Sequence, residues 1–209
     1  MRLFVWGSAP NPRRVKMYLA EKGLSVPTDD VGDGFQLSAG YKAEYPFALV
    51  PMLELDDGTQ IGEAIAICRY FEALHPDPPL MGTEAKDKAM IEMWERRAYD
   101  EGFLGAAEVF RNTHRAFVDR SLPGYAGAVP QIEALVTRGH QRLARFFDMF
   151  DRQLAGNEFV AGKRISVADI TALCAVDFAK NLAKVSIPDE HRHLRRWYDA
   201  LSARPSAKV

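Results

Sequence analysis

Three short stretches of the chain carry groups that could take part in chemistry. Residues 7–15 (GSAPNPRRV) place Ser8 and Asn11 at a corner between an apolar run and a helical pattern, where chains often meet a ligand. Glu63 and Ala64 begin a second helical pattern, and the free N–H groups and dipole of a helix start attract anions. Residues 111–114 (RNTH) gather polar groups at a helix end. Whether these groups can share one site depends on the elements that carry them.

The first half of the chain alternates strand and helix patterns. Residues 3–6 (LFVW) predict a buried strand, and residues 12–22 a helix with Asn11 as N-cap, Pro12 as first helical residue and Gly23 at the far end. A weaker strand is expected at 26–31 and a short irregular helix at 38–44. In residues 52–61 (MLELDDGTQI) an Asp-Gly pair predicts a hairpin, and a helix follows over 63–74. The predicted order is β-α-β-α-β-β-α.

The second half is predicted to be helical throughout. A proline-rich stretch at 75–82 (HPDPPLMG) is typical of a connection between domains. We therefore expect an α/β domain at 1–75, a linker at 76–83 and an all-helical domain at 84–209. Thr83 is the expected cap of the first helix of that domain, and residues 166–169 (SVAD) form a capping signature before an apolar run.

Composition excludes several classes of function. The 209 residues are 47% hydrophobic and carry a formal charge of −1, which disfavours nucleic acid and anionic membranes as partners. No apolar run reaches the length of roughly 18 residues needed to cross a bilayer, and the N-terminus does not read as a signal peptide, so a cytoplasmic location is expected. Cys68 and Cys174 read as buried thiols. His191 and His193 would face different sides of a helix, and no metal site is predicted.

Several motifs, in order along nearly the whole chain, resemble the glutathione transferase family. They are residues 14–15 and 19–23 (RV, LAEKG), 45–54 (YPFALVPMLE), 56–59 (DDGT), 63–67 (EAIAI), 159–162 (FVAG) and 166–170 (SVADI). The resemblance implies a thioredoxin-like first domain (βαβαββα) followed by an all-α helical bundle. The chain is most similar to atypical bacterial and fungal members that lack the usual first-domain tyrosine, serine or cysteine.

The resemblance implies glutathione as co-substrate and assigns residues to it. The Val50–Pro51 peptide bond would be cis and would turn the preceding backbone, with Leu49, toward the cysteinyl part of glutathione. Glu63 and Ala64 would receive the γ-glutamyl carboxylate at a helix start. A serine usually stands at the position of Ala64, so weaker glutathione binding is expected. Gln36 either holds the glycine end or is a plain surface residue.

The implied reaction needs glutathione as the thiolate, which is the nucleophile. Ala9 occupies the position of the usual activating side chain, so Ser8, Asn11 and the start of the first helix are the candidates nearby. From the helical domain, His114 or Thr113 could hold a water against the sulfur, although a solvated helix end explains these residues too. Lowering a thiol pKa of about 8.5 by about two units takes about 2.7 kcal/mol, which a helix start and one charge-assisted hydrogen bond can supply.

Three functions fit this reading. The first is conjugation of glutathione to a small hydrophobic electrophile, the second is glutathione binding with little turnover, and the third is glutathione-dependent reduction of peroxides or disulfides. The first corner has no cysteine, which disfavours dithiol chemistry. The resemblance also implies a homodimer.

Overall fold

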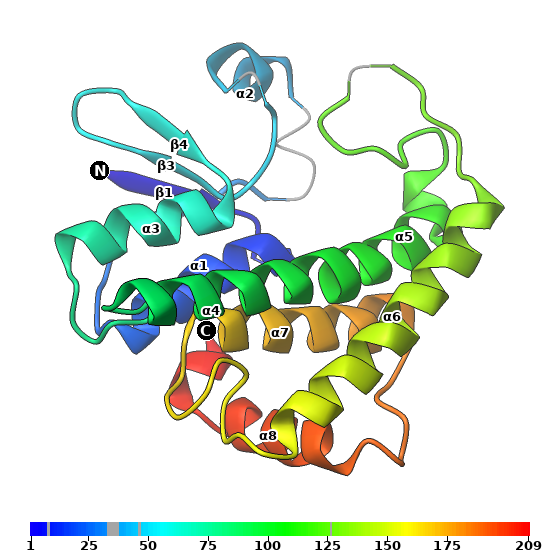
Figure 1. Ribbon diagram of the computed structural model, residues 1–209. Coiled ribbons are helices and arrows are strands. Elements are labelled where there is room, and N and C mark those ends of the chain that lie inside the picture. The colour runs from blue at the N-terminus through cyan, green and yellow to red at the C-terminus, as the bar shows by residue number, and fades with distance from the viewer. Residues whose placement is uncertain (8, 33–37, 46, 126) are drawn as a thin grey trace. The chain divides into compact units, whose positions relative to one another are not determined.

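The computed structural model describes residues 1–7, 9–32, 38–45, 47–125 and 127–209. The chain forms two compact units, Met1–Pro78 together with Val209, and Pro79–Lys208. The first unit contains a small mixed sheet with helices, and the second is helical (Figure 1). This confirms the predicted fold class.

In the described part of the first unit the sheet has four short strands, β1 (Arg2–Val5), β2 (Thr28–Asp30), β3 (Met52–Glu54) and β4 (Gln60–Gly62). Their spatial order is β2-β1-β3-β4. β1 runs parallel to β2, while β3 is antiparallel to both β1 and β4. The hairpin predicted around Asp57-Gly58 is thereby confirmed. β2 is shorter than the sequence pattern predicts, and all three of its residues are exposed.

The register of the sheet brings three distant segments to one end of it. Phe4 lies opposite Met52, and Met52 lies opposite Gly62. The chain leaving β1, the chain entering β3 and the chain leaving β4 therefore meet at the same end of the sheet. These are the segments that carry the corner at residues 7–15, the Val50–Pro51 bond and Glu63.

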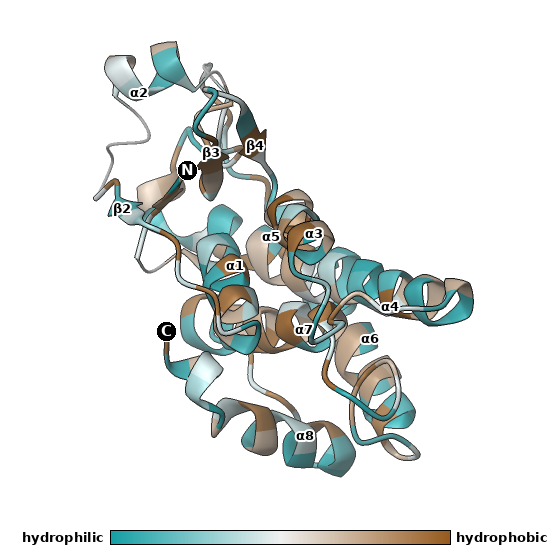
Figure 2. Ribbon diagram, turned by 90° about the vertical axis from the view of Figure 1, so that its left-hand side faces the viewer, coloured by the Kyte–Doolittle hydropathy of each residue, from teal (hydrophilic) through white to brown (hydrophobic). Residues whose placement is uncertain are grey.

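Three helices accompany the sheet among the described residues of the first unit. α1 (Pro10–Glu21) and α3 (Ala64–Leu74) lie on one side of the sheet, and α2 (Ala39–Glu44) lies on the other side (Figures 1 and 2). Apolar residues recur at helical spacing along α1 and α3, so they lie on one face of each helix, and these are the positions that are buried. Gly23 ends α1 with a φ of 67°, a conformation that glycine adopts without strain.

A buried charge latch ties the end of α1 to the end of α3. The Lys22 side chain is fully buried, pairs with Glu72 and donates hydrogen bonds of 2.6 Å to the carbonyls of His75 and Pro78. The Tyr18 hydroxyl also donates to Glu72, and burial together with that carboxylate raises the pKa of Tyr18. A buried ammonium is costly unless it is paired and hydrogen-bonded. These contacts therefore hold the last residues of the first unit, 75–78, against the end of α1.

The helical unit opens with an unbroken helical run. α4 (Ala85–Arg97) continues through the π-helical segment η2 (Ala98–Phe103) into α5 (Leu104–Thr113), and the short 3-10 turn η3 (Arg115–Phe117) follows. α5 packs closely on α6 (Glu133–Leu154), where a Cβ added to Gly139 would stand 2.8 Å from the Gly105 carbonyl oxygen. Glycine at both positions therefore allows the two backbones to approach. In Figure 2 the outward face of α4 is largely hydrophilic.

The core of the helical unit is α7 (Val167–Phe178), which is buried on nearly every side. Ser166 and Asp169 form the predicted capping box. Asp169 is fully buried and accepts hydrogen bonds from the backbone of Val160, from the backbone and hydroxyl of Ser166 and from the Trp197 indole. Burial raises the pKa of Asp169, and these donors oppose that effect. The segment η4 (Ala179–Ala183), α8 (Arg192–Ser202) and η5 (Pro205–Lys208) follow.

The expected cap at Thr83 is wrong. The cap is one residue later, at Glu84, which makes no side-chain capping bond, and α4 begins at Ala85. Asp87 in the first turn accepts a 3.3 Å hydrogen bond from the backbone N–H of Thr83, which ties the residue before the cap to the first turn of α4. Cys68 and Cys174 are buried thiols, as predicted. Among the helices of the described residues, none combines the length and the apolar character that crossing a bilayer requires.

Candidate active site

The corner after β1 is built differently from the prediction. α1 begins at Pro10 with Ala9 as N-cap, so Asn11 and Pro12 are the second and third helical residues. The prediction of Asn11 as cap is therefore wrong. Pro10 is itself suited to the first helical position, which lets the helix start two residues earlier without a side-chain cap. Ser8 lies outside the residues that the structure describes.

Asn11 nevertheless provides hydrogen-bond donors at this corner. Pro10 and Pro12 have no N–H, so Asn11 carries the backbone N–H of the first three helical positions. Its side-chain oxygen accepts a 2.9 Å hydrogen bond from Nη1 of Arg14, whose residue is only 3% exposed. With its oxygen engaged in this way, the amide Nδ2 group has no hydrogen-bond partner within the described part of the chain and is available as a donor.

Asp30 fixes the corner to the sheet. Its carboxylate accepts hydrogen bonds of 3.0 Å from the backbone N–H groups of Gly7 and Gly32. A Cβ on Gly7 would lie 2.8 Å from that carboxylate, so a larger residue there would force the Asp30 side chain to move. The start of α1 is thus held in place by β2.

The segment before β3 has the expected backbone form. The Val50–Pro51 peptide bond is cis. Tyr41 on α2 donates from its hydroxyl to the Leu49 carbonyl at 3.1 Å, and Val50 packs against the buried cluster that contains Tyr41 and Met52. Leu49 itself is 41% exposed. The hydrogen bond from Tyr41 and the packing of Val50 therefore hold the segment in place, while Leu49 is exposed.

The start of α3 carries an unusual backbone conformation. Glu63 is the N-cap with a φ of 63°, a region that residues other than glycine rarely adopt. Its carbonyl accepts the first helical bond from Ile67 at 3.1 Å, and the following Ala64 is 3% exposed. Residues held in such conformations cluster at ligand sites. The first N–H groups of α3 have no acceptor within the helix and can bind an anion.

The polar groups at the end of α5 are mostly committed to structure. Asn112 donates to the Glu108 carbonyl and accepts from the backbone of Ile132, while Thr113 donates to the Val109 carbonyl at 2.8 Å. Thr113 is therefore a poor candidate for holding a water, because its proton is already donated.

His114 retains one free ring nitrogen. Nδ1 accepts a 3.3 Å hydrogen bond from the backbone of Ala116, and the ring packs against Phe110 with centroids 5.0 Å apart. When Nδ1 accepts, the proton of the neutral ring sits on Nε2, which can donate to a water or a ligand. The residue is exposed.

Sequence reasoning missed two contributors in the first unit. The bond from Arg14 to Asn11 joins residues three apart on a helix, a spacing that permits contact and that could have drawn attention to the pair. The positive φ of Glu63 had no sequence signal. Gln36, assigned to the glycine end of glutathione, lies outside the described residues.

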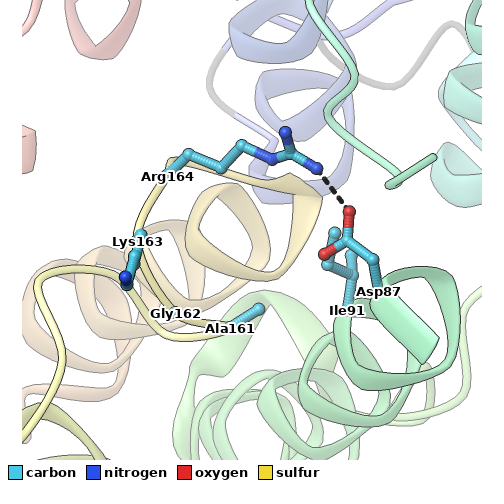
Figure 3. Close-up of a pocket in the computed structure, with 6 residues that line it drawn as sticks. All are labelled: Asp87, Ile91, Ala161, Gly162, Lys163 and Arg164. Atoms are coloured by element: carbon cyan, nitrogen blue, oxygen red, sulfur yellow. Dashed lines mark hydrogen bonds and ion pairs between the residues drawn. The ribbon is translucent and has the colours of Figure 1, made fainter. Parts of the chain in front are cut away.

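One pocket, of about 370 Å³, is found in the helical unit and holds none of the predicted residues. It is lined by Asp87, Ile91, Ala161, Gly162, Lys163 and Arg164. Figure 3 shows the ion pair between Arg164 and Asp87, while Lys163 points away from that pair. The pair fixes the chain between α6 and α7 to α4. Across the part of the chain that the structure covers, no three His, Cys, Asp or Glu residues are grouped to hold a metal ion.

Comparisons with known proteins agree with the two-unit architecture. Residues 9–74 match the family model of the glutathione S-transferase N-terminal domain, and residues 111–205 match that of the C-terminal domain. Glutathione S-transferase 2 of Saccharomyces cerevisiae is 32% identical over 210 aligned residues, which cover 96% of this chain and 85% of the yeast protein.

Solved structures give the same result. A glutathione S-transferase domain-containing protein of Marinobacter aquaeolei is 34% identical, with a TM-score of 0.89 and 99% coverage of both chains. The Gtt2 structure from Saccharomyces cerevisiae is 30% identical with a TM-score of 0.86, covering 100% of this chain and 99% of that one.

Proposed function

This chain belongs to the glutathione S-transferase family, and on that premise we propose that it joins reduced glutathione to a small hydrophobic electrophile through a thiolate stabilised at the start of α1. The thiolate attacks an electrophilic carbon, a carbon–sulfur bond forms, and the leaving group departs with the electron pair of the bond that breaks. The thiol proton passes to solvent.

The register of the sheet is the observation that carries this proposal. Because Phe4, Met52 and Gly62 lie side by side, the corner after β1, the Val50–Pro51 segment and Glu63 lie at the same end of the sheet. In the proposed complex the cysteinyl part of glutathione pairs with the backbone at Leu49 and Val50. The γ-glutamyl carboxylate binds the N–H groups at Glu63 and Ala64, and Gln36 holds the glycine end.

The proposed thiolate site relies on Asn11. Its backbone N–H and its Nδ2 group are two donors on one residue, and the bond from Arg14 orients the side chain. Hydrogen bonds to a charged group contribute about 1.5–3 kcal/mol each, and lowering a thiol pKa by about two units takes about 2.7 kcal/mol. Two such donors therefore suffice to lower the thiol pKa by about two units. Ser8 and a water held by Nε2 of His114 are further proposed contributors.

Turnover distinguishes this proposal from its alternatives. We expect conjugation above the solution rate with at least one member of a panel of aryl halides, activated alkenes and epoxides. Tight calorimetric binding of glutathione without turnover would favour the binding protein, a reading motivated by the missing hydroxyls at Ala9 and Ala64. Consumption of glutathione with cumene hydroperoxide but with no electrophile would favour the peroxidase.

We further propose that the enzyme is a homodimer. Several large apolar side chains are exposed on the isolated chain, among them Phe47 at 80%, Leu74 at 50% and Met93 at 39%. Exposed apolar groups of this kind favour association between subunits.

A further inference from the structure

Hydrogen bonds from within the first unit hold the segment that enters β3. The backbone N–H of Ala48 donates to the Tyr45 carbonyl at 2.9 Å, and the Tyr41 hydroxyl donates to the Leu49 carbonyl at 3.1 Å. Ala48 has a φ of 50°, a left-handed conformation that residues other than glycine rarely adopt. Such conformations persist only where the surrounding structure fixes them, and they cluster at ligand sites. The backbone at Ala48 and Leu49 is therefore set by its contacts.

Tyr41 is itself held rigidly. It is 1% exposed, and its ring packs on the Tyr45 ring with centroids 4.7 Å apart. Its backbone N–H donates to the Ser38 hydroxyl at 3.1 Å, which caps the start of α2. Burial, aided by the nearby Glu44 carboxylate, raises the pKa of Tyr41 to about 12. The hydroxyl therefore keeps its proton at neutral pH and acts as a fixed donor.

The peptide between Leu49 and Val50 carries the effect of this donor to the opposite side of the backbone. The peptide bond is trans and planar, so its C=O and its N–H point in opposite directions. Because the Leu49 oxygen is turned toward Tyr41, the Val50 N–H is turned away from Tyr41. Among the residues that the structure describes, this N–H meets no acceptor. A carbonyl that accepts a hydrogen bond also polarises its peptide, which makes the N–H a better donor.

We propose that Tyr41 is a positioning residue for glutathione, which directs the Val50 N–H toward the carbonyl of the cysteinyl residue. This inference rests on the proposed function and assigns the pairing of the cysteinyl part to Val50, because the Leu49 carbonyl is already engaged. Tyr41 acts through the peptide and does not contact the sulfur. Its hydroxyl therefore contributes to the affinity for glutathione and leaves the chemistry of the thiolate unchanged.

Removing the Tyr41 hydroxyl tests the proposal, because Tyr41→Phe keeps the packed ring. Calorimetry with glutathione should show a Kd raised about threefold to tenfold, the loss expected for one neutral hydrogen bond. KM for glutathione should rise as well, while kcat and the pKa of the bound thiol stay at their wild-type values. Tyr45→Phe is the matched control, because its hydroxyl belongs to the same cluster but donates to Glu54 at 2.8 Å. The Kd of this control should stay within about twofold of the wild type.

A second measurement applies even if Tyr41→Phe does not fold. In the isotopically labelled wild-type protein, nuclear magnetic resonance follows the Val50 amide during a titration with glutathione. We expect the amide proton to move downfield and to exchange more slowly with solvent, because it gains an acceptor. In folded Tyr41→Phe saturated with glutathione, the same amide should exchange faster than in the saturated wild type.

Other results would overturn the inference. Equal rises in Kd in Tyr41→Phe and Tyr45→Phe would show that only the packing of the cluster matters. An unchanged Kd in Tyr41→Phe, or a Val50 amide that glutathione does not shift, would show that the cysteinyl part is received elsewhere. Failure of every electrophile to react would contradict the proposed function alone, because calorimetry and amide exchange need no reaction. Absence of glutathione binding to the wild type would contradict both.

Discussion

The chemistry proposed for this chain depends on individual backbone and side-chain donors rather than on one activating hydroxyl. Ala9 places a methyl group where the family resemblance implies that most members have an activating side chain, and two prolines remove N–H groups from the first turn of α1. Asn11 is left as the residue with both a backbone and a side-chain donor. Arg14, buried beneath it, holds the amide by its oxygen.

Substituting Asn11 should therefore raise the pKa of the bound thiol. Asn11→Ala removes the side-chain donor while keeping the backbone N–H, so we expect a rise of about 1–2 pKa units, from about 1.5–3 kcal/mol lost at about 1.36 kcal/mol per unit. The measurement is the pH dependence of thiolate absorbance with glutathione bound. Asn181→Ala, at an exposed asparagine of the helical unit, is the control. A pKa in Asn11→Ala equal to that of the wild type would remove Asn11 from the mechanism.

Ala64 offers a gain-of-function test. Ala64→Ser restores a hydroxyl at the first position of α3, where it can donate to the γ-glutamyl carboxylate. Glutathione should then bind about tenfold more tightly or better, corresponding to a charge-assisted hydrogen bond of about 1.5–3 kcal/mol. Calorimetry measures this, with Ala66→Ser as the matched control because that residue is exposed on the same helix. Unchanged affinity in Ala64→Ser would mean that the carboxylate binds elsewhere.

At the scale of elements, two buried networks hold the units in shape. In the first unit Lys22 joins α1 to α3 through Glu72. Lys22→Met leaves that carboxylate partly buried without its cation, so it should lower the free energy of unfolding by about 3–5 kcal/mol. Urea unfolding measures the change, and Lys16→Met on the same helix should cost far less. A similar small loss in both variants would show that the latch contributes little.

In the helical unit the corresponding element is the cap of α7. Asp169→Ala leaves the buried indole of Trp197 and two backbone N–H groups without an acceptor, and each unsatisfied donor costs about 1–3 kcal/mol. We expect a loss of at least about 3 kcal/mol in thermal or urea unfolding. Asp148→Ala, which breaks an exposed pair with Arg152, should cost about 0.3–0.5 kcal/mol. If the two variants proved equally stable, the network would have no structural importance.

The limits of sequence reasoning are clearest at the ends of helices. The cap at Ser166 was predictable because the capping box is a local pattern with both partners three residues apart. The caps at Asn11 and Thr83 were wrong because an unassisted N-cap, Ala9 or Glu84, leaves no side-chain signal. Lys22 and Glu72 are 50 residues apart in the sequence, and only the packing of α1 on α3 brings them together.

At the scale of the whole molecule, the prediction concerns association. A homodimer should have a mass of about twice 23.4 kDa by light scattering on a size-exclusion column, because exposed apolar side chains favour pairing. A constant mass near 23.4 kDa at micromolar concentration would contradict this proposal. The proposed direct contacts to glutathione come from the first unit and would stand in either case.

We propose that this chain stabilises the glutathione thiolate without a dedicated hydroxyl at the position of Ala9. The direct measurement is the titration of thiolate absorbance for glutathione bound to the wild-type protein. We expect a pKa about two units below the ordinary thiol value of about 8.5. Titration of the bound thiol at the same pKa as free glutathione would contradict it.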